Sequence, residues 1–104
     1  MNKEHYTNLV KALEALPKKE LGARIIYNPY TNLYCAIGAL GLFDGNINLK
    51  IENSMKVYRY FRIKGYSVHT IIAINDKFGM DENSRDCYTR MLAWAKNGLK
   101  YSNA

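Results

Sequence analysis

An unbroken apolar segment near the middle of the chain constrains the fold more than any other feature. Residues 33–43 read Leu-Tyr-Cys-Ala-Ile-Gly-Ala-Leu-Gly-Leu-Phe and contain no charged side chain. A glycine inside a helix, such as Gly38, costs about 1 kcal/mol relative to alanine, and a sequence tolerates that where another backbone must come close. We therefore predict that residues 33–43 form a central buried helix, capped by Thr31 or Asn32, against which the other elements pack.

Apolar periodicity predicts further helices on both sides of this segment. Residues 3–16 place apolar side chains on one stripe and stop before Pro17, which cannot continue the hydrogen-bond ladder. Residues 68–78 follow Ser67, a suitable N-cap, and precede Gly79, which suits the position after a helix. Both helices are expected to pack on the central one.

The last predicted helix opens at Asp81 or Asn83 and runs to about Asn97. Acidic side chains gather near its beginning and basic ones near its end, as the helix dipole prefers. Gly98 is expected to cap it, because glycine readily adopts the left-handed conformation found after many helices.

Two shorter segments favour other structure. Residues 23–27 are β-prone, with Ile25 and Ile26 at their centre, and residues 28–32 consist of turn formers. Residues 44–46, Asp-Gly-Asn, predict a further turn after the central helix.

The segment of residues 47–64 is compatible with two structures. Residues 47–51 alternate between apolar and polar side chains, which favours a strand or extended arm, and residues 55–64 are β-prone enough to pair with it as a hairpin. The alternative is a helix over residues 55–64, capped by Ser54 and ended by Gly65. We prefer the helix.

Length and composition complete the fold prediction. A chain of 104 residues suits a single domain, residues 1–104, and an apolar share of 48% is enough for one core. We expect a mainly α fold, with α+β as the alternative: a compact bundle of four to five short helices with a small β element. Because the chain has no apolar run of roughly 20 residues and no signal peptide, we expect a cytoplasmic protein without membrane contact.

The positive charge of the chain is concentrated in one segment. Of the net charge of +6, residues 1–52 supply +1 (six basic, five acidic side chains) and residues 53–104 supply +5 (nine and four). A basic patch attracts anionic partners, and aromatic side chains within it can stack on bases or anchor a protein interface. The candidate binding residues are Lys56, Tyr58, Arg59, Tyr60, Arg62, Lys64 and Tyr66. The alternative is that the aromatic side chains fill the core while the charges stay in solvent.

One arrangement suggests nucleophilic catalysis: Cys35 precedes His69 and then Asn75 or Asp76, the chain order of papain-like enzymes. A helix N-terminus would lower the pKa of the Cys35 thiol. However, Cys35 lies in the apolar segment and His69 on a predicted helix, so we assign no catalytic residue. Cys35 and Cys87 are expected to be buried free thiols rather than a disulfide, because a domain with a proper core needs no bridge.

Motifs for metals and cofactors are missing from the sequence. The two cysteines and two histidines lack the spacing of a zinc site, and the chain has no glycine-rich phosphate loop. We therefore expect neither a metal nor a cofactor.

Two short segments resemble a group of small uncharacterised bacterial and phage proteins. Residues 35–40, Cys-Ala-Ile-Gly-Ala-Leu, resemble the Cys-Ala-Leu-Gly-Ala-Leu core of that group, and Ile71–Asp76 resembles its Ile-x-x-x-Asn-Asp segment. The resemblance implies a compact helical domain, often encoded by phages and mobile elements, with no activity to transfer. Within it Cys35, Gly38, Asn75 and Asp76 are structural residues, and we expect the last two to fix the turn between the final helices.

Together these features predict a non-enzymatic binding protein of phage or mobile-element type. It would occupy a surface of a host protein or nucleoprotein complex, in host defence or in the replication or transcription machinery. The first alternative is a nucleic-acid-binding module that uses residues 56–66, whose affinity would fall steeply with salt. The second alternative is a cysteine-dependent hydrolase.

Overall fold

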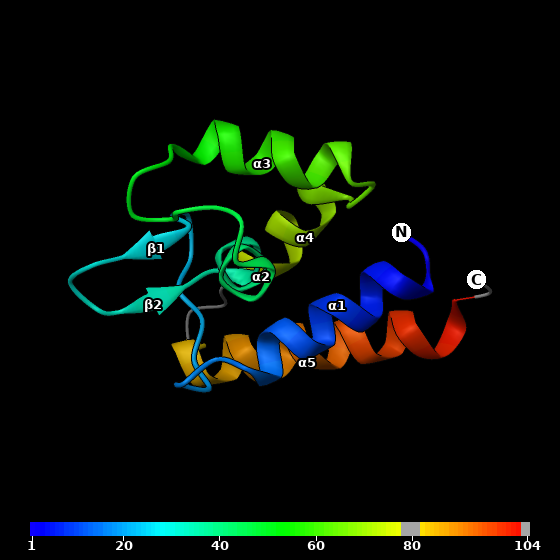
Figure 1. Ribbon diagram of the computed structural model, residues 1–104. Coiled ribbons are helices and arrows are strands. Elements are labelled where there is room, and N and C mark those ends of the chain that lie inside the picture. Colours follow the sequence, from blue (N-terminus) through cyan, green and yellow to red (C-terminus); the bar gives the residue numbers. More distant parts are fainter. Residues whose placement is uncertain (78–81, 103–104) are drawn as a thin grey trace.

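The computed structural model describes residues 1–77 and 82–102. Within these residues the chain forms five helices and one two-stranded antiparallel sheet (Figure 1), which confirms the prediction of a mainly α fold with a small β element. The Cα radius of gyration is 12.6 Å, close to the roughly 13 Å expected of a compact domain of this length. None of the described helices is long and apolar enough to cross a membrane.

Helix α1 (Lys3–Glu14) follows the predicted apolar stripe. Asn2 and His5 form a capping box at its start, in which each side chain accepts a hydrogen bond from the other residue's backbone N–H. Its inner stripe includes Leu9 and Leu13, which are both fully buried. The helix ends two residues earlier than predicted.

Helix α2 (Ala36–Asp44) lies at the centre of the fold, as predicted. It contacts α1, α3 (Ser54–Ile63) and α4 (Val68–Asn75). The first six residues of α2, residues 36–41, are all buried. Burial of residues 36–41 on all sides explains why that part of the helix is apolar on every face rather than striped. In the last turn Leu42 and Phe43 are apolar but 45% exposed.

Leu33 and Tyr34 form a strand, which corrects the predicted start of the central helix. Strand β1 (Tyr27–Asn28) pairs with β2 (Leu33–Tyr34), with Tyr27 opposite Tyr34. Asn32 adopts a left-handed φ of 58° and its Oδ1 accepts a hydrogen bond from the Tyr27 hydroxyl. The turn formers at residues 28–32 therefore reverse the chain. In the predicted β-prone segment, residues 23–27, only Tyr27 belongs to a strand.

Cys35 caps α2, in place of the predicted Thr31 or Asn32. The Cys35 Sγ accepts a hydrogen bond from the backbone N–H of Gly38 at 3.4 Å. A Cβ at Gly38 would overlap the backbone carbonyl of Ile26. The expected close approach of another backbone at Gly38 is thus confirmed.

Residues 54–63 form helix α3, which confirms the preferred helix over the hairpin. Asn53, rather than Ser54, caps it through a hydrogen bond from the Lys56 backbone N–H to Asn53 Oδ1. Gly65 has a φ of 93° and follows the helix as predicted. Residues 47–51 form bends and turns in place of the alternative strand.

Helix α4 ends at Asn75, three residues before the predicted boundary. The Asn75 side chain bonds to backbone groups outside its own helix. Ser67 precedes the helix as predicted but makes no capping hydrogen bond through its side chain. The predicted end at Gly79 lies outside the described residues.

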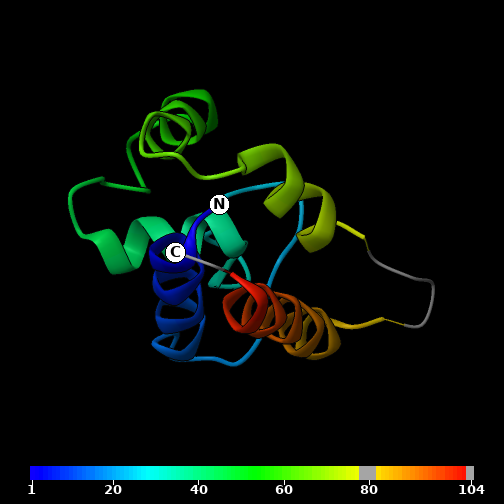
Figure 2. The same ribbon diagram turned by 90° about the vertical axis from the view of Figure 1, so that its right-hand side faces the viewer.

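Helix α5 (Ser84–Tyr101) runs antiparallel to α1 along the base of the molecule (Figures 1 and 2). Asn83 is its cap, one of the two predicted residues, and Asp81 lies outside the described residues. The prediction that Gly98 ends the helix is wrong. The helix continues through Gly98 to Tyr101, and residue 98 is a glycine where the Tyr6 ring packs in the place of a Cβ.

The core lies where α2 meets the pair of α1 and α5. In Figure 1, α1 and α5 form the lower layer, α2 the middle, and α3 the upper edge, with the hairpin at one side. The largest fully buried apolar side chains come from all five helices and include Leu9, Leu13, Ile37, Leu40, Phe61, Ile71 and Met91. α3 therefore covers the core with one face and leaves its other face toward solvent.

Candidate functional site: the outer face of α3

Two side chains anchor α3 to the core. Val57 and Phe61 are each 1% exposed, and they lie one helical turn apart on the inner side. At 100° per residue, Arg59 lies directly opposite them, with Met55 and Ile63 one turn before and after it. The inner and outer sides of this helix are thus fixed by the packing.

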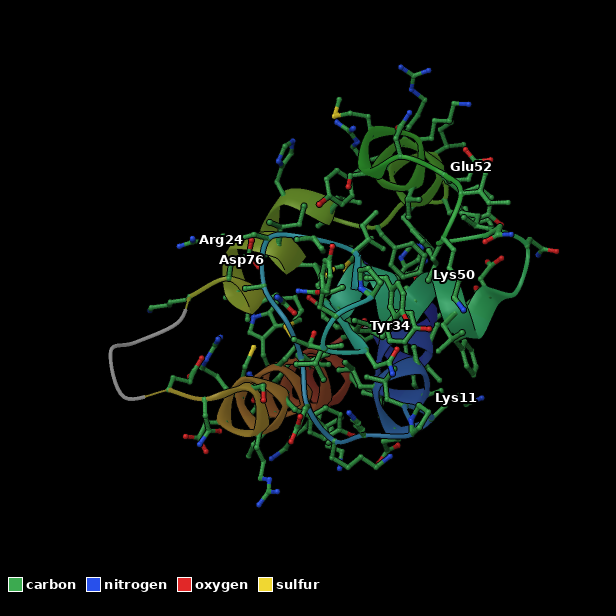
Figure 3. All side chains as sticks on the ribbon, turned by 90° about the vertical axis from the view of Figure 1, so that its left-hand side faces the viewer. Lys11, Arg24, Tyr34, Lys50, Glu52 and Asp76 are labelled. Carbon is green, nitrogen blue, oxygen red and sulfur yellow. The ribbon has the colours of Figure 1, made fainter. Side chains whose placement is uncertain are left out.

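The outer side of α3 combines exposed apolar and basic side chains. Ile51, Met55 and Ile63 are 78%, 64% and 79% exposed, although they are large and apolar. Nitrogen-tipped side chains project from the same helix into solvent (Figure 3). We call this surface the α3 outer face, and it consists of Met55, Lys56, Arg59, Arg62 and Ile63. Ile51 lies in the turn that precedes the helix.

The Arg side chains of this face have no acidic partner inside the described structure. Lys56 Nζ lies 3.6 Å from Glu52 Oε2, but both side chains are well exposed, so the pair contributes little. Arg59 and Arg62 form no salt bridge with any residue in the ranges 1–77 and 82–102. Their charges are available to an external partner.

Tyr66 belongs to the core, which corrects its assignment as a binding residue. It is 8% exposed, and its ring packs against His5 and Phe61 at centroid distances of 4.5 and 5.5 Å. The Tyr66 hydroxyl accepts a hydrogen bond from Asn8 Nδ2 at 3.2 Å, and burial raises its pKa. It is not available to stack on a ligand.

Tyr60 and Lys64 bind Asp44 at the end of α2. The Tyr60 hydroxyl donates to Asp44 Oδ1 at 2.9 Å, and Lys64 Nζ donates to Oδ2 at 3.0 Å while lying 4.4 Å from the Tyr60 ring centroid. Burial alone would raise the pKa of Asp44, but these hydrogen bonds hold it below its usual 3.8. The cluster fastens α3 to α2, so Lys64 is engaged within the protein.

Tyr58 lies on the other flank of α3, half-buried above a small cavity that Cys35 and Asp76 also line. Burial raises the pKa of its hydroxyl. The tyrosines of the predicted site therefore flank the helix or enter the core, and only Lys56, Arg59 and Arg62 of that site remain on the outer face. The sequence prediction missed Met55 and Ile63, although their position on the side of the helix opposite Val57 was a usable signal.

Cys35 and His69 are not arranged as a catalytic pair. The Cys35 thiol is 5% exposed, and its burial raises its pKa to about 11, against the lowering expected from a helix N-terminus. His69 is exposed on α4, and no hydrogen bond joins the two within the described residues. Cys35 and Cys87 are both buried free thiols, as predicted.

Asn75 and Asp76 join three segments through their side chains. Their predicted role in the turn before α5 stays a prediction, because residues 78–81 lie outside the described structure. Asn75 Oδ1 accepts from the Ala36 backbone N–H at 2.8 Å, and its Nδ2 donates to the Gly22 carbonyl at 2.9 Å. Asp76 Oδ1 accepts from the Arg24 backbone N–H at 3.2 Å, and Figure 3 shows these two residues side by side. The two segments that carry the resemblance thus meet in space, at the N-terminus of α2.

Comparisons with protein-family models, with curated proteins and with solved structures give no match. The resemblance to small bacterial and phage proteins therefore stays a prediction. Within residues 1–77 and 82–102, no three His, Cys, Asp or Glu side chains gather in a way that could hold a metal ion.

Proposed function

We propose that the protein is a non-enzymatic binding protein whose α3 outer face covers an acidic, partly apolar surface on another protein. The observation that carries this proposal is the exposure of Met55 and Ile63 on either side of Arg59. Methionine and arginine are enriched in protein interfaces, and grouped exposed apolar side chains mark such surfaces. The function is therefore recognition by a preformed helix.

The charge of this face favours a different protein over a second copy of the same chain. Lys56, Arg59 and Arg62 would meet their own counterparts in a symmetric dimer, and like charges across an interface are costly. Acidic side chains on the partner would complement them. In line with the resemblance, the proposed partner is a bacterial host protein, such as a component of a defence complex or of the replication or transcription machinery.

Affinity capture with matched variants tests this proposal. The double variants Met55→Ser/Ile63→Ser and Arg59→Glu/Arg62→Glu alter the two components of the face separately. Lys11→Glu/Arg85→Glu is the control, because it makes the same charge change at exposed positions on other helices. We expect one host protein to be enriched by the wild type and the control and to be lost with both α3 variants. Equal enrichment by all four proteins contradicts the proposal.

Nucleic-acid binding is the second candidate, favoured by the three basic side chains that share one exposed helix face. Contacts of these side chains with the phosphate backbone of the nucleic acid would release counterions. A plot of log affinity against log salt concentration would then have a slope near −0.9 per neutralised phosphate. Fluorescence anisotropy with a labelled duplex at low salt tests it. Binding that Arg59→Glu/Arg62→Glu abolishes but Met55→Ser/Ile63→Ser leaves intact would favour this candidate over the protein partner.

The cysteine hydrolase is the least supported candidate, because burial keeps the Cys35 thiol protonated near neutral pH. Any hydrolytic activity of the purified protein that survives Cys35→Ala removes this candidate.

A further inference from the structure

A cleft separate from the α3 outer face lies between the end of α1 and the β-hairpin. It encloses about 290 Å³, and its walls include Lys18, Glu20, Tyr27, Asn32, Tyr34 and Lys50. Figure 3 faces this side of the molecule and shows Tyr34 and Lys50 close to the viewer. Residues from four separate segments therefore converge on one small space.

One wall of the cleft is aromatic and preformed. Tyr27 and Tyr34 are cross-strand partners whose ring centroids are 4.7 Å apart, with an angle of 38° between the ring planes. The Tyr27 hydroxyl donates to Asn32 Oδ1 at 2.5 Å, which holds the ring against the hairpin turn. Both side chains are half-buried, so part of each ring faces solvent. A planar group can stack there without first ordering the wall.

Two lysines also line the cleft and bring positive charge to it. Lys50 Nζ lies 5.8 Å from the centroid of the Tyr27 ring, and Lys18 projects from the connector after α1. Neither lysine forms a salt bridge within the residues that the structure describes. Glu20 adds a carboxylate that can accept hydrogen bonds from hydroxyl or amino groups. Aromatic, cationic and acceptor groups thus stand around a volume of small-molecule size.

We propose that this cleft binds a single nucleotide, with the base against Tyr27 and Tyr34 and the phosphate between Lys18 and Lys50. Stacking on an aromatic wall is open to every base, and the two ammonium groups supply the charge that a phosphate needs. The volume of about 290 Å³ lies just below the roughly 300–1,000 Å³ typical of ligand sites, so the cleft suits a ligand no larger than one nucleotide. The same chemistry could come from a free nucleotide or from the end of a single strand.

Amide-resolved NMR titration of the full chain tests this proposal. The probes are the four nucleoside monophosphates and a single-stranded tetranucleotide, with adenosine and inorganic phosphate as half-ligands. We expect a monophosphate to shift amides of residues 16–20, 27–34 and 48–50. Lys18→Ala and Lys50→Ala should each weaken its binding about tenfold, because each removes a charged hydrogen bond. Lys3→Ala, an exposed lysine at the far end of α1, should leave it unchanged.

The half-ligands decide whether base and phosphate are both recognised. The proposal is overturned if no monophosphate shifts these amides at millimolar concentration, or if adenosine or phosphate alone binds as tightly as the monophosphate. Tighter binding of the tetranucleotide at the same amides supports the site and assigns the ligand to a strand end. Tyr34→Leu tests the wall, and the two lysine variants keep the proposal falsifiable if that variant fails to fold.

Discussion

At the scale of single residues, Asn75 is a buried polar side chain that joins segments far apart in the sequence. It is 1% exposed and supplies both an acceptor for the Ala36 N–H and a donor for the Gly22 carbonyl. Those two backbone groups are 14 residues apart, and neither has a substitute partner in a helix or strand ladder. The Asn75 side chain, on α4, thus satisfies backbone groups in two other segments of the chain.

Replacing Asn75 should therefore destabilise the fold strongly. Asn75→Ala leaves buried backbone groups without hydrogen bonds, and we expect it to lower the free energy of unfolding by about 3 kcal/mol. Urea denaturation measures the change. Asn97→Ala, at an exposed helix position, is the control and should shift stability by less than about 0.5 kcal/mol. A small effect of Asn75→Ala would mean that water replaces the amide.

Asp44 predicts a pH dependence of stability. Its pKa is lower in the folded protein than the usual 3.8, so the folded state favours the ionised carboxylate. This contribution is fully present above pH 3.8 and is lost as the pH falls through the lowered pKa. Denaturation of wild type and Asp44→Asn should show the wild type more stable at pH 6, with a gap that narrows below pH 4. A gap independent of pH would exclude a role for the charge.

At the scale of secondary-structure elements, the two glycines of α2 show whether tertiary packing or helix propensity decides the effect of a substitution to alanine. A Cβ at Gly38 would overlap the Ile26 backbone carbonyl, whereas a Cβ at Gly41 would meet only the end of the Leu49 side chain, 2.6 Å away. We expect Gly38→Ala to destabilise the protein, although alanine is the better helix former by about 1 kcal/mol. Gly41→Ala should be neutral or stabilising, because Leu49 can move. Thermal melting of both variants compares them directly.

The two faces of α3 predict opposite outcomes for apolar substitutions. Met55→Ser/Ile63→Ser should change stability by no more than about 1 kcal/mol, because both side chains are exposed. Phe61→Ala removes a buried ring and should cost about 3–5 kcal/mol. If the exposed pair proved as sensitive as Phe61, the outer face would be packed in solution and unavailable for a partner.

Local sequence patterns were sufficient to predict the helices that have one apolar and one polar side. The apolar stripe of residues 3–16 predicted α1, and the helix preferred for residues 55–64 on the strength of its flanking Gly65 is confirmed as α3. The start of α2 was missed because Asn and Thr favour both helix caps and turns, and only the pairing of Tyr27 with Tyr34 decides between them. Asn75 contacts Ala36 across 39 residues of chain, a separation that local patterns cannot encode.

At the scale of the whole molecule, the two thiols report on global opening. Both are buried, and burial raises the pKa of each to about 11, so thiolate is scarce at pH 8. We expect negligible reaction of the native protein with a disulfide reagent and reaction of both cysteines in urea. Rapid labelling of one thiol without denaturant would show that its surroundings open locally.

The charge distribution of the molecule separates its two proposed surfaces. The α3 outer face presents arginine with large apolar side chains, whereas the cleft beside α1 presents lysine with tyrosine. The candidate binding segment of the sequence prediction contributes to the first surface through Lys56, Arg59 and Arg62. The second draws on Lys18, Tyr27, Tyr34 and Lys50, which are too scattered along the chain for a sequence pattern to connect.

The pairing of α1 with α5 has a consequence for synthesis on the ribosome. The Tyr88 hydroxyl donates to the Leu13 carbonyl, 75 residues earlier in the chain, and this contact belongs to the antiparallel base of the fold. α1 is translated first, and α2 can pack on it early, but the part of its apolar stripe that α5 covers stays open until α5 emerges. Non-local contacts of this kind form late, because loop closure must precede them. The nascent chain therefore exposes the α5-facing part of that stripe, where chaperones can bind, until the last helix is made.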